Sequence, residues 1–274
     1  MVRVVGIFNI LVLLGAGVFG YLRRADSYAL EVSIGIAGVA MANLAGRIDI
    51  FEPRYLWPTV LAGTVYRRSQ IRVSIAYLVA VPVDETQLLV RGHRITTQYQ
   101  PVGGVFKCRL SESELSRRFH ARPDIRFTPD QVSNNDLRLR LPGRDLHRLL
   151  KWFDSRHDRE LFPWREFHEE LIATGILDRR DFPFFDCTYL GTRHLPLRHD
   201  RFSGLRQLII GEIYELRPNE QQLKALRGLR EKHRSNPVDG IYFATREEIE
   251  RGGIVSGTQA TFDIAPTSAW LVRG

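Results

Sequence analysis

Two stretches near the N-terminus are apolar almost without interruption. Residues 4–22 contain a single strongly polar side chain, Asn9, and are followed by two arginines. At about 1.5 Å per residue, a helix of this length spans roughly 28 Å, close to the hydrocarbon thickness of a bilayer. Residues 29–46 form a second, weaker apolar segment after a short link. We therefore predict a transmembrane hairpin within residues 1–50, with spans at about 4–22 and 29–46.

Of three other interpretations of these apolar segments, the first two fit the sequence poorly and only the third stays open. A signal peptide would have a shorter apolar stretch and a small-residue cleavage site. A buried core helix would rarely stay apolar around its whole circumference. A single span, with the second segment lying at the interface, is the third. Arginines occur in the link and on both flanks, and their larger number on the flanks favours the cytoplasm for the rest of the chain.

The rest of the chain alternates between short apolar stretches and polar segments. After a junction at 51–70, residues 71–81 have the β-branched and aromatic content of a buried strand. The pattern predicts further strands at 87–90, paired back on the first, and at 94–100, 136–141, 187–190, 206–216 and 240–244. It predicts helices at 111–120, 163–173, 220–233 and 247–251. This order favours a mixed sheet between helices in a domain covering 71–274, with an arginine-rich insert at about 108–150.

The helix at 163–173 carries a pattern of acidic residues. Glu166, Glu169 and Glu170 stand at positions i, i+3 and i+4, so their carboxylates share one face of an α-helix. The opposite face is expected to pack into the core through Phe167, Leu171 and Ile172. Several carboxylates on one face are suited to a hard divalent cation that bridges phosphate oxygens.

Composition and charge narrow the class of partner. The net charge is +8, and only four of the 39 basic residues are lysines, so 35 are arginines. Arginine suits phosphate recognition because its planar group can donate two hydrogen bonds to one partner, although a GC-rich genome explains the excess equally well. Two cysteines without CxxC spacing do not indicate a secreted disulfide framework. The charge therefore favours an anionic partner, which on this ground can be a nucleotide, a nucleic acid or a lipid head group. Of these, direct nucleic-acid binding is not expected.

The acidic helix and an earlier glycine pair together resemble the Nudix family. Gly103 and Gly104, after the strand at 94–100, are expected to form a backbone turn, and Pro101 to Val105 resembles the first part of the family motif. Arg165 to Glu170 matches the helix of that motif residue by residue. The resemblance covers roughly 71–272. It implies that Glu166, Glu169 and Glu170 hold magnesium, that Arg165 orients them, and that catalysis would rest on Arg165, Glu169 and Glu170.

The chain departs from the family pattern in three places. The glycine expected after the glutamate pair is delayed to Gly175, and 61 residues, 105–165, separate Gly104 from Glu166. His157 stands where the family has an earlier acidic residue, and the nearby acidic residues are Asp154, Asp158 and Glu160. Whether the chain is a phosphoanhydride hydrolase therefore stays open.

The combination of two apolar spans with these motifs resembles a narrower group. This group is the two-transmembrane Nudix effectors of CBASS antiphage systems, which accompany bacterial cGAS-like nucleotidyltransferases (CD-NTases). The resemblance implies an inner-membrane protein whose Nudix-like domain senses a cyclic oligonucleotide. On activation the protein assembles as a homo-oligomer, and its hairpin disrupts the lipid bilayer. The alternative is a membrane-tethered, magnesium-dependent hydrolase of a nucleoside diphosphate-linked substrate.

Candidate ligand-binding residues follow from the same hypothesis. Gly103 and Gly104 are expected to approach the ligand closely. Arginines that flank the presumed cleft are expected to bind its phosphates, foremost Arg91, Arg94, Arg109 and Arg206, and also Arg193, Arg198 and Arg201.

Overall fold

The computed structural model describes residues 55–92, 95–124, 135–200, 203–253 and 262–272. Within these ranges no helix is both long enough and apolar enough to cross a bilayer. The predicted spans at 4–22 and 29–46 lie outside the described residues. The chain divides into two compact units, Met1–Leu56 and Trp57–Gly274, and the sheet belongs to the second.

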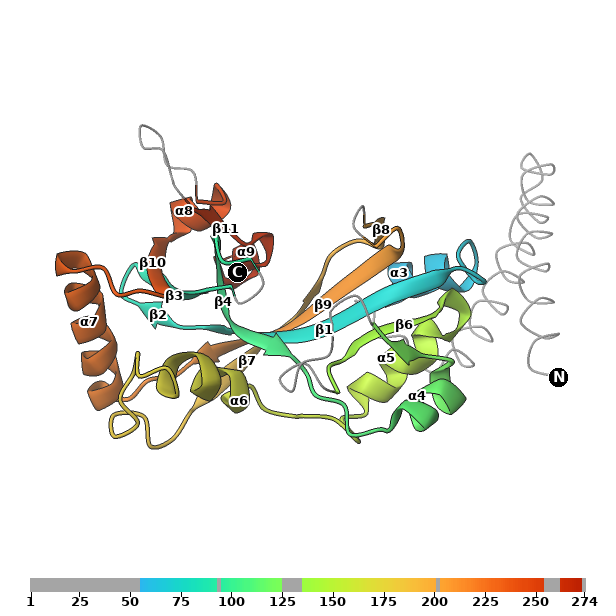
Figure 1. Ribbon diagram of the computed structural model, residues 1–274, viewed down its shortest axis with the longest axis horizontal. Coiled ribbons are helices and arrows are strands. Elements are labelled where there is room, and N and C mark those ends of the chain that lie inside the picture. Colours follow the sequence, from blue (N-terminus) through green and yellow to red (C-terminus); the bar gives the residue numbers. More distant parts are fainter. Residues whose placement is uncertain (1–54, 93–94, 125–134, 201–202, 254–261, 273–274) are drawn as a thin grey trace, which may run out of the picture. The chain divides into compact units, whose positions relative to one another are not determined.

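The long strand β1, Gln70–Ala80, lies at the centre of the sheet (Figure 1). One edge pairs in parallel with β9, Arg206–Leu216, over ten residue pairs. The other edge is shared between two antiparallel strands, β6 (Arg138–Pro142) along the first half of β1 and β4 (Gln98–Val105) along the second half. The mixed sheet expected from the sequence is confirmed.

Strand β4 also carries the sheet onward to β3, Thr86–Arg91, which pairs with it antiparallel. A tight turn at Asp84, with φ of 52°, returns the chain from β2 to β3. Next to the pairing of β2 with β3, the Leu88 N–H donates to the carbonyl of Val81, the last residue of the first predicted strand. The main partners of β3 are β4 and β10. The remaining strands are β2 (Pro82–Val83), β5 (Arg122–Pro123), β7 (Cys187–His194), β8 (Arg198–His199), β10 (Ile241–Thr245) and β11 (Asp263–Ile264).

Three of the predicted helices have local sequence signals that the structure confirms. α4, Glu112–Phe119, begins after a capping box at Ser111 and ends at His120 in the left-handed region. α7, Glu220–Ser235, has a capping box at Asn219. α8, Arg246–Glu250, has one at Thr245. The sequence did not predict α3 (Leu56–Gly63), α5 (Leu146–Asp154) or α9 (Ala269–Val272).

Helices cover both faces of the sheet around β3, because successive side chains of a strand point to opposite faces. Leu88 and Val90 pack in one core cluster with residues of the 163–173 segment and α7, among them Phe167, Leu171, Leu226 and Leu229. Leu89 packs in another cluster with residues of α8 and α9, namely Ile249 and Val272. β6 lies within the predicted insert at 108–150, and its pairing with β1 makes that part of the segment a member of the sheet.

Candidate functional site

The predicted acidic helix consists of two different turns. α6, Trp164–Phe167, is followed by a π-helical turn, His168–Ile172, in which the Ala173 N–H donates to the carbonyl of His168, five residues back. Phe167, Leu171 and Ile172 are buried in the core, as expected. Glu166 lies in α6, whereas Glu169 and Glu170 lie in the π-helical turn. The three glutamates have different partners.

Gly103 and Gly104 lie against this helix. The predicted turn at these residues is wrong, because both belong to β4, where Gly103 has φ of 141°. The Gly103 N–H donates to Glu170 Oε2 at 2.9 Å. A Cβ atom on Gly104 would lie 2.0 Å from Glu166 Oε1. A side chain at Gly104 would therefore displace the Glu166 side chain. The 61-residue separation in sequence disappears in the fold.

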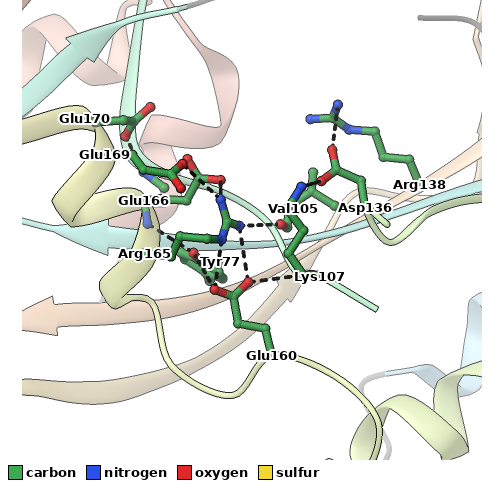
Figure 2. Close-up of polar contacts among 11 residues, drawn as sticks. Tyr77, Val105, Lys107, Asp136, Arg138, Glu160, Arg165, Glu166, Glu169 and Glu170 are labelled. Carbon is green, nitrogen blue, oxygen red and sulfur yellow. Dashed lines mark hydrogen bonds and ion pairs between the residues drawn. The ribbon is translucent and has the colours of Figure 1, made fainter. Parts of the chain in front are cut away.

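Arg165 donates hydrogen bonds to three carboxylates, those of Glu160, Glu166 and Glu169, as Figure 2 shows. Its Nε and Nη2 atoms donate to the two oxygens of Glu160 at 3.1 and 3.2 Å. Its Nη1 atom donates to Glu166 Oε1 at 2.6 Å and to Glu169 Oε2 at 3.2 Å. Nη2 also donates to the Val105 carbonyl at 3.1 Å, which ties the arginine to the end of β4. We refer to Glu160, Arg165, Glu166, Glu169 and Glu170 as the acidic site.

Burial determines the electrostatics of the acidic site. It raises the pKa of Glu170 to about 8, against the opposing effect of the Gly103 N–H. Burial also raises the pKa of Glu166, and the positive charge of Arg165 opposes that rise. Burial alone would lower the pKa of Arg165, but hydrogen bonds to Glu160 and the charge of Glu166 raise it. The acidic site therefore contains more buried carboxyl groups than the single positive charge of Arg165 can neutralise.

Several residues that contact the acidic site could not be recognised from the sequence. Tyr77 of β1 accepts a hydrogen bond from the backbone N–H of Glu166 and donates to Glu160 Oε1, both at 3.4 Å. The Lys107 N–H donates to Glu160 Oε2 at 3.1 Å, and Lys107 Nζ lies 2.7 Å from Asp136 Oδ1. Among the three acidic residues near the position of His157, it is Glu160 that contacts Arg165.

Those predicted ligand arginines that the structure describes have their contacts away from the acidic site. Arg206 pairs with Ile71 on β1, whereas Gly104 pairs with Tyr77, six residues further along the same strand. At the rise of a β-strand this separation is roughly 20 Å. The Arg206 guanidinium instead lies 4.0 Å from the centre of the Tyr66 ring.

The other described arginines of the set have partners of their own. Arg91 Nη2 lies 2.7 Å from Asp239, and the backbone N–H of Arg109 donates to the Asp158 carbonyl at 2.8 Å. Arg193 and Arg198 lie on β7 and β8, and Arg94 and Arg201 lie outside the described residues. A role for any of them in ligand binding stays a prediction.

The chemistry of the donors fits the magnesium that the Nudix motif implies, because Mg²⁺ prefers carboxylate oxygens. The positions of these side chains are less favourable for binding a cation. Arg165 occupies the space between the carboxylates, Glu170 accepts from Gly103, and the Glu169 side chain is 46% exposed. Within the described residues, no group of three or more His, Cys, Asp or Glu side chains is placed to hold a metal ion. Metal binding by Glu166, Glu169 and Glu170 would require these side chains to reorient.

The burial of Glu170 predicts a pH dependence of stability. Between its ordinary pKa of 4.5 and the raised value of about 8, the folded state holds a proton that the unfolded state has lost. Since stability falls with pH wherever the folded state binds more protons, the free energy of unfolding should fall as pH rises through this window. Glu170→Gln should remove this decline, and added Mg²⁺ should reduce it in the parent protein. Thermal unfolding across roughly pH 5–9 measures both.

Glu169→Gln is the matched control for this titration, because it removes a carboxylate from the exposed side of the same turn. It should keep the decline of the parent protein. Equal declines in the parent and in Glu170→Gln would contradict the role given to the buried carboxyl.

Comparison with known proteins agrees with this geometry. The family model described as SMODS-associated NUDIX domain matches residues 70–272. A search of curated proteins gives no match. The matched range begins at the first residue of β1 and ends at the last residue of α9, so it contains the whole sheet and the acidic site.

Proposed function

The chain belongs to the SMODS-associated NUDIX domain family, and from this premise we propose that its folded domain senses a cyclic oligonucleotide. Membership supports a Nudix effector associated with CD-NTase systems, the class expected from the sequence. Such systems produce cyclic oligonucleotides as signals, so a nucleotide of this class is the ligand that we propose.

The contact between the acidic helix and the glycine pair is the observation that carries this proposal. It keeps the two parts of the Nudix motif together despite their separation in sequence. Glu166, Glu169 and Glu170 would hold a divalent cation here, and that cation would supply positive charge toward phosphate oxygens. Arg165 orients Glu166 and Glu169 through Nη1, and Glu160 fixes the guanidinium from the other side.

The membrane part of the proposal rests on the sequence. The apolar segments at 4–22 and 29–46 form a hairpin in the bacterial inner membrane, with the folded domain in the cytoplasm. Ligand binding drives assembly of several copies, and the assembled hairpins disrupt the bilayer. Small residues at Gly15, Ala16, Gly35 and Gly38 support close helix approach in lipid.

A second candidate function is a tethered, magnesium-dependent hydrolase of a nucleoside diphosphate-linked substrate. The observation that favours it is the pairing of Arg165 with Glu160, Glu166 and Glu169. Through these ion pairs Arg165 holds two of the motif glutamates, Glu166 and Glu169, next to each other. Glu169 is the most exposed of the three motif glutamates and is therefore the carboxylate best placed to meet a substrate.

One experiment separates the two functions. The purified protein is incubated with Mg²⁺ and a panel of cyclic oligonucleotides and nucleoside diphosphate derivatives, and both binding and product formation are measured. A sensor should bind a cyclic oligonucleotide and return it unchanged. A hydrolase should form product, and Glu169→Gln should abolish turnover without lowering the unfolding temperature, because the change keeps the shape and removes the charge.

The exposed Glu247→Gln on α8 serves as the control for charge removal away from the site. Absence of binding across the panel would contradict the sensor. Unchanged turnover in Glu169→Gln would remove the catalytic assignment.

A further inference from the structure

Helix α3, Leu56–Gly63, exposes several of its large apolar side chains. It contains no charged residue. Its buried positions are Pro58, Thr59 and Ala62, which include a polar side chain and a small one. Trp57 and Val60 are instead 69% and 39% exposed. A helix at the surface of a protein in water ordinarily shows the opposite distribution, with polar residues facing the solvent.

Further exposed residues, one apolar and two positively charged, follow the end of the helix along the chain. Val65 is 67% exposed, and Arg67 and Arg68 follow it at exposed positions. Tryptophan beside arginine is typical of a segment that lies at the head-group level of a membrane. Anionic lipids attract exposed arginines of this kind. We call Trp57, Val60, Val65, Arg67 and Arg68 the α3 surface.

The α3 surface is firmly attached to the sheet. The Gly143 N–H donates to the Ser69 carbonyl at 3.0 Å, and the Arg144 N–H donates to the Arg67 carbonyl at 3.2 Å. A Cβ atom on Gly143 would lie 2.4 Å from the carbonyl oxygens of Ala62 and Tyr66, so the backbones are in close contact. The chain then enters β1, which carries Tyr77 to the acidic site (Figure 1).

From this arrangement we infer that the α3 surface docks on the head-group region of an anionic bilayer. The inference rests on the proposed function, because the predicted hairpin ends about ten residues before α3 and holds this helix close to the lipid. Exposed apolar side chains enter the interface, and Arg67 and Arg68 meet the lipid phosphates. The docked helix fixes the orientation of β1, and with it the acidic site, relative to the membrane.

The test uses the full chain, bound to vesicles of phosphatidylethanolamine and phosphatidylglycerol, in which a fraction of the lipids carries bromine near the head group. Bromine quenches tryptophan fluorescence at short range. The chain has four tryptophans, Trp57, Trp152, Trp164 and Trp270. Quenching should be strong in the parent protein, largely lost in Trp57→Phe, and retained in Trp164→Phe, the control at another partly exposed tryptophan.

A second measurement tests the charge of the α3 surface. Full-length Val12→Arg/Leu13→Arg, in which hairpin insertion is opposed, should still float with phosphatidylglycerol vesicles and not with phosphatidylcholine vesicles. Adding Trp57→Asp should reduce this flotation at least several-fold.

The outcomes separate the inference from the proposed function. Flotation of the parent protein with vesicles supports the hairpin. If quenching is then the same in the parent protein and in Trp57→Phe, the inference about the α3 surface is overturned. The inference is also overturned if Trp57 emission is shifted to shorter wavelength without quenching, because protein, from a second copy or from the hairpin, then covers the α3 surface. Failure of the parent protein to float with any vesicle contradicts both.

Discussion

Gly103→Ala is expected to unfold the protein at a markedly lower temperature and to abolish nucleotide binding. A Cβ atom at this position would lie 2.2 Å from the Tyr77 carbonyl oxygen, on the neighbouring strand β1. The residue also has φ of 141°, which side chains other than hydrogen disfavour. Overpacking costs roughly 1–3 kcal/mol, and the backbone conformation costs about 1–2 kcal/mol more. A fall in Tm of roughly 5–15 °C follows for a domain of this size.

The loss of binding has a separate cause, because the Gly103 N–H donates to Glu170. Any displacement of β4 removes that hydrogen bond and moves the acidic helix. Gly228→Ala is the matched control. It lies in α7 with nothing within 4 Å of its Cβ position, and alanine there should raise stability by about 0.5–1 kcal/mol. A Gly103→Ala protein with the parent's Tm and affinity would show that the contact between strand and helix is not required.

Val12→Arg with Leu13→Arg is expected to abolish protection of cells against phage, in bacteria that also carry the cognate nucleotide synthase. Each charge at the centre of a span costs about 2.5–3.5 kcal/mol on the insertion scale, so the pair opposes insertion by roughly 5–7 kcal/mol. The folded domain should be unaffected, with the same Tm and the same nucleotide affinity as the parent protein. Survival after phage challenge and retention in the membrane fraction after a high-salt wash measure the effect, because salt releases protein that is held at the surface by charge alone.

The control for this change is Val12→Leu with Leu13→Val, which keeps the segment apolar and should protect fully. If the charged variant protected as well as the parent protein while staying out of the membrane, bilayer disruption would be the wrong mechanism. The hydrolase would then be the better account.

Elements with local signals could be predicted from the sequence. Ser111 caps a helix whose third residue, Glu114, completes a capping box, and these short-range contacts fix α4 between the bounds that the pattern indicates. The strand predicted at 206–216 coincides with β9, because a segment rich in aliphatic and aromatic residues suits a strand buried between β1 and β7. The acidic helix and its core face were also predictable from spacing alone.

Features that depend on distant contacts could not be predicted. A glycine pair serves a turn and a close approach equally well, and only the position of Glu166 beside Gly104 decides between them. Spacing places the three glutamates on one face of an α-helix, but a π-helical turn contains two of them, and Glu170 is buried whereas Glu169 is exposed. Tyr77 belongs to an ordinary buried strand, and its role in the site appears only when Glu160 and Glu166 meet its hydroxyl group.

The most direct measurement of the central claim is dye release from sealed vesicles that contain the full-length protein, titrated with individual cyclic oligonucleotides in the presence of Mg²⁺. The account predicts release with one class of cyclic oligonucleotide, no release with its linear hydrolysis product, and no release from Val12→Arg/Leu13→Arg with any ligand. Vesicles that stay sealed while the protein is saturated with a cyclic oligonucleotide, or that leak equally without one, would contradict it.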